Sequence, residues 1–300
     1  MIKSVTAELI YKTQVICGEG PVWDEVEQKL YWIDIENDHV YLFNPENGAN
    51  TGWNVGKMIG ALTLREKGGL LLVLSNGFNS FDPETGEVTP VINPEKELSE
   101  HYFNDGKCDP KGRFWAGTYH QNAEDAVGSL YSLETDLSVV KRDKNFILGN
   151  GLAWSIDKTK FYFIDSVAGC IYVYDYDVLT GNITNRNILR QIEGDTQLPD
   201  GMTIDSEGFL WVAIFNGGKV LRIDPLTGKT VFEVLIPNAK QVTSCTFGGK
   251  NLDELYITTA KILEGPDRIP ENELAVQTNA GGLFKIKLNY KGVIATRFKG

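Results

Sequence analysis

Residues 150–181 read NGLAWSIDKTKFYFIDSVAGCIYVYDYDVLTG, and this stretch decides the fold. It contains three short apolar segments separated by polar residues: Gly151–Trp154, Phe161–Ile164 and Ile171–Tyr174. Apolar segments of this length between turn residues are typical of β-strands. The stretch ends in the turn Asp177–Gly181, where Asp caps the turn and Gly supplies the positive φ needed to leave it. It therefore predicts three consecutive strands of one antiparallel sheet.

The same unit recurs along the whole chain. A Gly or Ser opens a first apolar strand at six positions separated by 40, 46, 45, 50 and 43 residues, and a second apolar strand follows each of them. The six opening residues are Gly20, Gly60, Gly106, Gly151, Gly201 and Ser244. Each unit has room for a fourth, outer strand, and four short antiparallel strands in such a repeat are the signature of a propeller blade. We therefore expect an all-β protein, a six-bladed β-propeller with four-stranded antiparallel blades, forming a single domain over residues 1–300.

The two ends of the chain are expected to close the ring. Gly281–Ile286 would complete the last unit, and a strand near Val5–Leu9 could pair with it. Long helical patterns are absent from the sequence, which argues against a doubly wound or barrel α/β fold.

Composition narrows the functional classes. Hydrophobic residues make up 42% of the 300 residues, which is enough for a sizeable core and excludes a disordered chain. The formal net charge of −11 and the pI of about 4.9 argue against nucleic-acid or anionic-membrane partners. We expect a small-molecule ligand and a monomer or weak dimer.

The cysteines and the start of the chain bear on the compartment. The four cysteines, at positions 17, 108, 170 and 245, form no C-x-x-C pair and have no histidine at zinc-finger spacing. Buried, reduced thiols in a cytoplasmic protein are the simplest interpretation. Residues 1–14 hold no apolar run of signal-peptide length, and the longest aliphatic run, Leu70–Leu74, is too short to cross a bilayer.

A ring of polar residues is expected at one mouth of the central channel. The innermost strand of every propeller blade starts there, so the residue before each opening Gly or Ser should lie in that ring. These residues are Glu19, Ile59, Asp105 (with Asn104 beside it), Asn150, Asp200 and Thr243. Several carboxylates in a narrow channel are unfavourable without a cation, and oxygen ligands suit a hard divalent ion such as Ca²⁺, Mg²⁺ or Mn²⁺. The alternative is that each is an ordinary turn residue, since Asn-Gly and Asp-Gly are common turn signals. The ring as a set favours the metal.

Other catalytic signatures find less support. The chain contains no G-x-S-x-G, H-E-x-x-H, P-loop or EF-hand motif. His39 is expected on the solvated surface. His101 and His120 bracket the Asn104 strand and could reach the channel mouth, although the simpler interpretation is that neither has a functional role.

Four segments resemble the regucalcin/gluconolactonase family, also known as the senescence marker protein and luciferin-regenerating enzyme family. They are Gly18–Trp23, Phe103–Lys107, Asn150–Ser155 and Pro199–Met202. The similarity runs from roughly residue 8 to the C-terminus. It implies a six-bladed propeller, in agreement with the repeat count.

The resemblance also implies a site and an activity. One divalent metal would lie in the channel, held by Glu19, Asn150 and Asp200, and Ca²⁺, Zn²⁺, Mn²⁺ and Mg²⁺ all remain open. Asn104 would contact the substrate and a metal-bound water. The implied activity is hydrolysis of sugar lactones such as gluconolactone, which would make the protein a hydrolase acting on carboxylic esters.

The chain departs from the family pattern at two positions. Tyr102 stands where many members have Arg, and Asn122 stands where vertebrate members have a Glu that contacts the substrate. An Arg offers a forked, permanently charged donor, whereas Tyr offers one hydroxyl and a stacking face. We expect Tyr102, His120 and Asn122 to shape the pocket, and the loop over residues 118–128 to set selectivity.

The leading hypothesis for the mechanism is metal-dependent lactone hydrolysis. The metal would polarise the lactone carbonyl, and Asp200 would act as general base for the attacking water. Three alternatives stay open: a non-catalytic calcium-binding or regulatory protein, a hydrolase for another ester, and an interaction scaffold, of which the last is the weakest.

Overall fold

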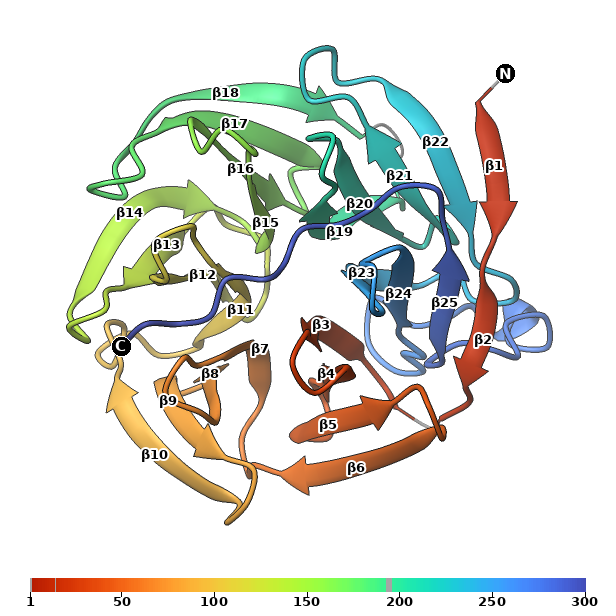
Figure 1. Cartoon of the computed structure of the whole chain (residues 1–300), viewed down its shortest axis with the longest axis horizontal. Helices are drawn as coiled ribbons and strands as arrows, with labels where there is room; N and C mark the ends of the chain where they lie inside the picture. The colour runs from red at the N-terminus through yellow and green to blue at the C-terminus, as the bar shows by residue number, and fades with distance from the viewer. Residues whose placement is uncertain (1, 14, 193–195) are drawn as a thin grey trace.

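Six β-sheets surround a central axis in this computed structural model, which describes residues 2–13, 15–192 and 196–300 (Figure 1). Each sheet runs radially, with one strand nearest the axis and the others stepping outward. The six-bladed propeller with antiparallel blades predicted from the repeat is confirmed. The one helical element in the described ranges is a single 3₁₀ turn, η1 (Glu271–Glu273), and none of the described helices is long and apolar enough to span a bilayer.

The first four blades each consist of four consecutive strands, numbered here from the axis outward. Blade 1 contains β3 (Gly18–Asp24), β4 (Lys29–Asp34), β5 (His39–Asn44) and β6 (Ala49–Asn54). Blade 2 contains β7 (Ile59–Leu64), β8 (Leu70–Leu74), β9 (Gly77–Asp82) and β10 (Glu87–Ile92). Blade 3 contains β11 (His101–Cys108), β12 (Phe114–His120), β13 (Gly128–Leu133) and β14 (Val139–Phe146). Blade 4 contains β15 (Gly149–Trp154), β16 (Lys160–Asp165), β17 (Cys170–Tyr176) and β18 (Ile183–Gln191).

The last two blades recruit the N-terminal segment. Blade 5 contains β19 (Leu198–Ile204), β20 (Leu210–Phe215), β21 (Lys219–Ile223) and β22 (Thr230–Leu235), with β1 (Lys3–Thr6) added in parallel outside β22. Blade 6 contains β23 (Val242–Gly248), β24 (Glu254–Thr259) and β25 (Leu283–Lys287), and β2 (Glu8–Tyr11) is its outer strand.

Closure of the ring therefore occurs as predicted, but through a different division of the segment. Leu9 pairs with Phe284, which confirms that the N-terminal segment completes the last blade. The prediction of one pairing strand over Val5–Leu9 is wrong, because Val5 pairs with Val234 in blade 5 instead. Ala7, buried between the two strands, donates its N–H to Leu235 O at 3.0 Å, so the segment passes from one blade to the next there.

The core lies between neighbouring blades. The second strand of each blade is almost wholly buried, as in β8, where all five residues are buried. Trp115 and Trp211 occupy equivalent positions in β12 and β20 and donate their indole N–H to Asp109 and Asp205. Trp32 lies one position further along β4 and donates to Asn50, and all three rings are fully buried. A satisfied donor on a large apolar ring lets these residues fill the space between sheets without an orphaned polar group.

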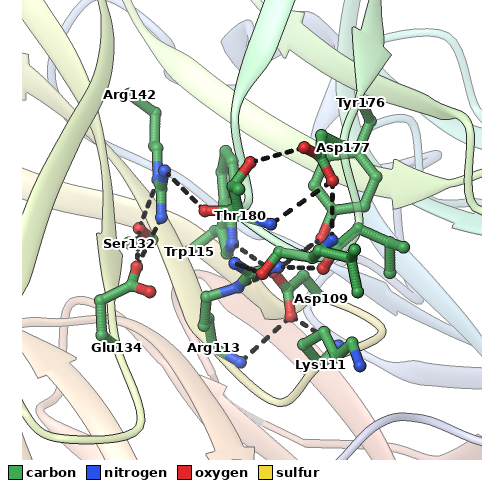
Figure 2. Close-up of polar contacts among 12 residues, drawn as sticks. Asp109, Lys111, Arg113, Trp115, Ser132, Glu134, Arg142, Tyr176, Asp177 and Thr180 are labelled. Atoms are coloured by element: carbon green, nitrogen blue, oxygen red, sulfur yellow. Dashed lines mark hydrogen bonds and ion pairs between the residues drawn. The ribbon is translucent and has the colours of Figure 1, made fainter.

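A buried polar network ties blade 3 to blade 4 (Figure 2). Asp109 accepts hydrogen bonds from Arg113 Nε at 2.5 Å and Trp115 Nε1 at 3.0 Å. It also accepts one from Tyr176 Oη, which belongs to blade 4, at 2.8 Å. Arg113 continues into blade 4 through Val178 O at 2.8 Å. Asp109 is fully buried, and its charge is satisfied by partners from both blades, so the network joins the two sheets.

All six innermost strands carry an irregularity at the same place. Their register with the second strand shifts at Glu19–Val22, Ile59–Ala61, Phe103–Gly106, Asn150–Leu152, Pro199–Met202 and Val242–Ser244. A β-bulge bends a strand and re-aims a side chain. The residue that the repeat placed in the ring lies within this irregularity or directly before it.

Two of the glycines that follow ring residues lie where the innermost strands crowd together at the axis. A Cβ on Gly60 would lie 2.5 Å from Asn104 O, and a Cβ on Gly151 would lie 2.6 Å from Asp200 O. Both contacts are with the backbone of the next innermost strand, so a side chain could be accommodated only by moving that strand. At these two positions the recurring Gly therefore reflects how closely neighbouring innermost strands approach one another.

The C-terminal segment, residues 288–300, crosses the axis at one end of the channel (Figure 1). Ser206 N donates to Lys291 O at 2.7 Å at one end of this segment, and Phe298 N donates to Leu64 O at 2.8 Å at the other. Between these anchors, residues 293–296 cover a cavity of about 290 Å³. All six innermost strands line this cavity.

The anchor at Phe298 should contribute strongly to stability. Its ring is fully buried between blades 2 and 3, whereas Ile294 in the same segment is 60% exposed. Phe298→Ala should lower the free energy of unfolding by about 3–5 kcal/mol, and Ile294→Ala should change it by less than about 0.5 kcal/mol. Urea denaturation followed by tryptophan fluorescence measures both. Equal effects of the two substitutions would contradict an anchoring role.

Candidate functional site

The predicted ring residues all lie on innermost strands. Each lies within the register shift of its own strand or directly before it, on β3, β7, β11, β15, β19 and β23: Glu19, Ile59, Asp105, Asn150, Asp200 and Thr243. Two of them are not available as ligands. Ile59 is apolar, and Thr243 donates its hydroxyl to Gly18 O at 2.5 Å. The carboxylates and the amides remain.

Asn150 and Asp200 are in direct contact. Asn150 Nδ2 donates to Asp200 Oδ1 at 2.5 Å and to Ser166 Oγ at 3.0 Å. Asn104, one strand away, donates its Nδ2 to Gly149 O at 3.0 Å, which leaves its Oδ1 without a partner among the described residues. Strands rather than loops hold these side chains, so their positions are fixed before any ligand arrives.

Glu19 carries an unsatisfied oxygen. Its side chain is only 6% exposed, and Oε2 accepts a hydrogen bond from Gly20 N. Oε1 is buried and has no partner in the described part of the chain. A buried carboxylate oxygen without a partner is costly, so such an atom in a native structure calls for a ligand.

The carboxyl groups in the ring interact strongly. Burial, and then repulsion from Asp200 and Asp105, raises the pKa of Glu19 well above its ordinary value. Burial, and then repulsion from Asp105, does the same to the pKa of Asp200. Burial also raises the pKa of Asp105, while the Lys107 ammonium opposes that rise. The three buried carboxyls therefore interact electrostatically across a poorly solvated region.

These residues fit a hard divalent cation. Among the described residues, no three His, Cys, Asp or Glu side chains form a metal-binding group. The set found here has another composition, since it combines the carboxylates of Glu19 and Asp200 with the amide of Asn150. Oxygen donors alone, one of them orphaned, match the preferences of Ca²⁺, Mg²⁺ and Mn²⁺.

The cavity beneath the C-terminal segment is a different place. Gly106, Lys107 and Cys108 line it, but none of the six ring residues does. On each innermost strand the residues that line the cavity follow the ring residue. The ring and the cavity therefore occupy successive levels of one channel.

Tyr102, His120 and Asn122 group together at the end of blade 3. His120 pairs with His101 across β11 and β12, and Tyr102 pairs with Tyr119. Asn122 N donates to His120 Nδ1 at 3.3 Å. The structure gives no direct contact between these side chains and Glu19, Asn150 or Asp200 in the described residues. They form a separate rim, linked to the ring through Asn104 on the same strand.

The histidines are engaged elsewhere. His101 Nδ1 lies 3.3 Å from Glu95 Oε2, and His120 Nε2 lies 3.6 Å from Glu100 Oε2. His39 stacks on Tyr41 with ring centroids 5.6 Å apart, on the outer part of blade 1.

Cys17 and Tyr119 were assigned no role near the ring in the sequence analysis, although Tyr119 lies in the loop over residues 118–128 that we expected to set selectivity. Burial, followed by the charges of Glu19 and Asp200, raises the pKa of the Cys17 thiol well above its ordinary value. Burial raises the pKa of Tyr119 to about 12, with contributions from Glu36 and Cys17. A thiol held in its neutral form is a poor nucleophile, so Cys17 is unsuited to covalent catalysis. No motif marks either residue; their order in the repeat was the one usable signal.

A long insertion was also missed. Residues 260–282 separate β24 from β25, where the other blades have short turns. Within it, the Asp267 carboxylate contributes to the raised pKa of Asp200, and Asp267 O accepts from Gln241 Nε2 at 2.6 Å. The insertion thus reaches the ring end of the channel.

Comparison with known proteins adds independent information. The family model described as "SMP-30/Gluconolactonase/LRE-like region" matches residues 17–261. Regucalcin of Xenopus laevis is 39% identical over 305 residues, which cover 100% of both chains. "Putative sugar lactone lactonase YvrE" of Bacillus subtilis (strain 168) is 37% identical over 288 residues, covering 96% of this chain and 97% of that protein. The solved structure of luciferin-regenerating enzyme superposes with a TM-score of 0.89 at 31% identity, covering 98% of this chain and 99% of that one.

The crowded carboxyls should make the metal-free protein sensitive to pH. A carboxyl whose pKa rises on folding binds its proton more tightly in the folded state than in the unfolded state. Its ionisation therefore destabilises the fold as the pH climbs from the pKa of the unfolded chain, about 4.3 for Glu, through the raised pKa of the folded protein. Glu19→Gln should therefore raise the melting temperature in EDTA at pH 8 by a few degrees, about 1 kcal/mol in a domain of this size. At pH 5 the gain should shrink.

Thermal unfolding with excess chelator at the two pH values measures this difference. Glu46→Gln, at an exposed position of the same blade, serves as control and should change neither midpoint. A Glu19→Gln effect that is independent of pH would mean that Glu19 is not part of a repelling cluster.

Proposed function

Since the chain belongs to the SMP-30/gluconolactonase/LRE-like family, we propose that it is a metal-dependent lactonase that hydrolyses sugar lactones. The observation that carries the proposal is the buried oxygen cluster on the innermost strands, with Glu19 Oε1 left unpartnered. Relatives named as lactonases support the reaction class. The four free cysteines support a reducing, cytoplasmic location.

Glu19, Asn150 and Asp200 are the proposed ligands of one divalent cation. Asn150 would offer its amide oxygen once the amide is turned over, because its Nδ2 faces Asp200 in this structure. When bound, such an ion supplies Lewis-acid polarisation of the lactone carbonyl. Ca²⁺, Zn²⁺, Mn²⁺ and Mg²⁺ are the ions to be distinguished.

Asp200 is the proposed general base. Its carboxylate would take one proton from the attacking water while the water oxygen adds to the lactone carbonyl carbon. The ring C–O bond then breaks, and the departing oxygen receives that proton, which gives the hydroxy acid. A carboxyl with a raised pKa suits this exchange near neutral pH.

Asn104 is the proposed orienting residue. Its Nδ2 is held by Gly149 O, so the free Oδ1 has a fixed direction in which to accept a hydrogen bond from water or a substrate hydroxyl. Tyr102, His120 and Asn122 would then contact the sugar at the rim. With a hydroxyl and a ring in place of a guanidinium at position 102, this rim favours neutral sugars over acidic ones.

Calcium binding without catalysis is the second candidate. The same oxygen cluster favours it, because orphaned carboxylate oxygens satisfy Ca²⁺ with or without a reaction. A hydrolase for another ester would use the same groups and differ only at the rim.

Metal removal should abolish lactone hydrolysis. Chelator-stripped protein should show no turnover of gluconolactone or other aldonolactones, and one of the four divalent ions, added singly, should restore it. Acid release in a weakly buffered indicator assay measures the rate. If no lactone is hydrolysed with any of the ions, but calorimetry shows that metal binds, the result would favour the calcium-binding alternative. Hydrolysis of simple esters alone would favour another ester substrate.

Replacing the base should remove the chemistry and leave the fold. Asp200→Asn retains the shape of the side chain and should lower kcat by 10²-fold or more, within the range for general acid–base catalysis. Asp267→Asn, an exposed carboxylate near the same centre, should lower it by less than about threefold. Circular dichroism confirms folding of both. An Asp200→Asn variant that keeps more than a tenth of the wild-type kcat would refute the assignment.

A further inference from the structure

Lys107 reaches across the central channel. It lies on β11 in blade 3, and its Nζ donates a hydrogen bond to Met202 O on β19 in blade 5. The innermost strand of blade 4, β15, lies between these two strands (Figure 1). The lysine side chain therefore bridges two blades that are not neighbours, directly after the ring level.

In the described residues the Lys107 ammonium forms no direct ion pair with a ring carboxylate, but it lies close enough to interact electrostatically with two of them. Burial lowers the pKa of Lys107, and attraction by Asp105, two residues before it, and by Glu19 on β3 in blade 1 opposes that fall. Met202, its hydrogen-bond partner, follows Asp200 by two residues on the same strand. Two ring carboxylates thus act on Lys107 electrostatically, and its hydrogen bond ends two residues from the third.

The formal charges of this group do not balance without a cation. With all three carboxyls ionised, as cation binding would require, Glu19, Asp105 and Asp200 supply three negative charges and Lys107 one positive charge, which leaves two negative charges. One divalent cation neutralises that remainder. A net charge left in a poorly solvated volume is strongly unfavourable, so the remainder selects the charge of the ion that binds.

We propose that Lys107 is the internal counter-ion of the cation site, and that by cancelling the charge of Asp105 it tunes the site to a divalent ion. This inference rests on the proposed cation site but not on the identity of the substrate. Lys107 neither ligates the cation nor contacts the reacting atoms. It changes the affinity of the site for a cation through the net charge of the surrounding groups.

The counter-ion role and a purely structural role predict opposite effects. If Lys107 only braced the channel, its loss would loosen the ligands and weaken cation binding. If it is the counter-ion, its removal leaves three uncompensated carboxylates, and cation binding becomes tighter. The sign of the change in affinity therefore separates the two roles.

The experiment is calorimetric titration of chelator-stripped protein with Ca²⁺ and, separately, Tb³⁺, at fixed pH and ionic strength. Lys107→Met keeps the length and apolar stem of the side chain and should lower the Ca²⁺ dissociation constant by about tenfold. The Tb³⁺ dissociation constant should fall further, by about another tenfold, because the three negative charges left in the site then match the three positive charges of Tb³⁺. Asp105→Asn should raise the Ca²⁺ dissociation constant by about tenfold.

The double variant is the decisive comparison. Lys107→Met with Asp105→Asn restores two net negative charges and should bring the Ca²⁺ dissociation constant back to within about threefold of the wild type. Lys158→Met is the matched control, since Lys158 lines the same cavity but is exposed, and it should change neither affinity. Should Lys107→Met fail to fold, the double variant must still bind Ca²⁺ about tenfold more tightly than Asp105→Asn alone.

Two results would overturn the proposal: a Lys107→Met protein that binds Ca²⁺ as the wild type does or more weakly, or a double variant that binds no more tightly than Asp105→Asn. Absence of Ca²⁺, Mg²⁺, Mn²⁺ and Zn²⁺ binding by the wild type is a separate outcome, and it would overturn the proposed cation site itself. Lactone turnover is not used in either comparison.

Discussion

The close approach of six strands around one axis is the constraint on which the rest of the structure depends. At Gly60 and Gly151 the backbone of the next strand lies where a Cβ would have to be. Glycine is therefore required at these two positions, and the register of each strand shifts there, directly after the ring residue. The same crowding that closes the ring thus produces a ring of re-aimed side chains with little room for water.

That constraint also explains why the site is electrostatically costly and why the fold tolerates it. Glu19 and Asp200 repel one another in a poorly solvated volume, and the two strands that carry them would not stay in this arrangement without the rest of the fold. The surrounding sheets are held by buried tryptophans and by charges that are fully paired, such as Asp109 with Arg113. Stability supplied between the blades therefore maintains an unfavourable arrangement at the axis, as functional sites commonly require.

The structural features that could be predicted from the sequence are those that repeat along it. Short strands and Asp/Asn-to-Gly turns are local signals, so six units gave the blade count, and the residue before each opening Gly gave ring positions such as Asp200. Features that occur once were invisible to that reasoning. The division of the N-terminal segment at Ala7, the insertion over residues 260–282 and the reach of Lys107 to Met202 all depend on contacts between distant parts of the chain. Periodicity carries no information about such contacts.

The two ends of the channel are not equivalent, and the direction of the innermost strands explains why. All six begin at the ring and run toward the cavity, so the polar bulges gather at one end and the regular strand residues at the other. The cavity end is covered by residues 293–296, which are anchored on both sides through Lys291 and Phe298. The ring end is bordered instead by the rim with Tyr102 and by the insertion over residues 260–282. We propose that a ligand of the ring approaches from the rim, so that the rim side chains, more than those of the ring, select the molecules that bind.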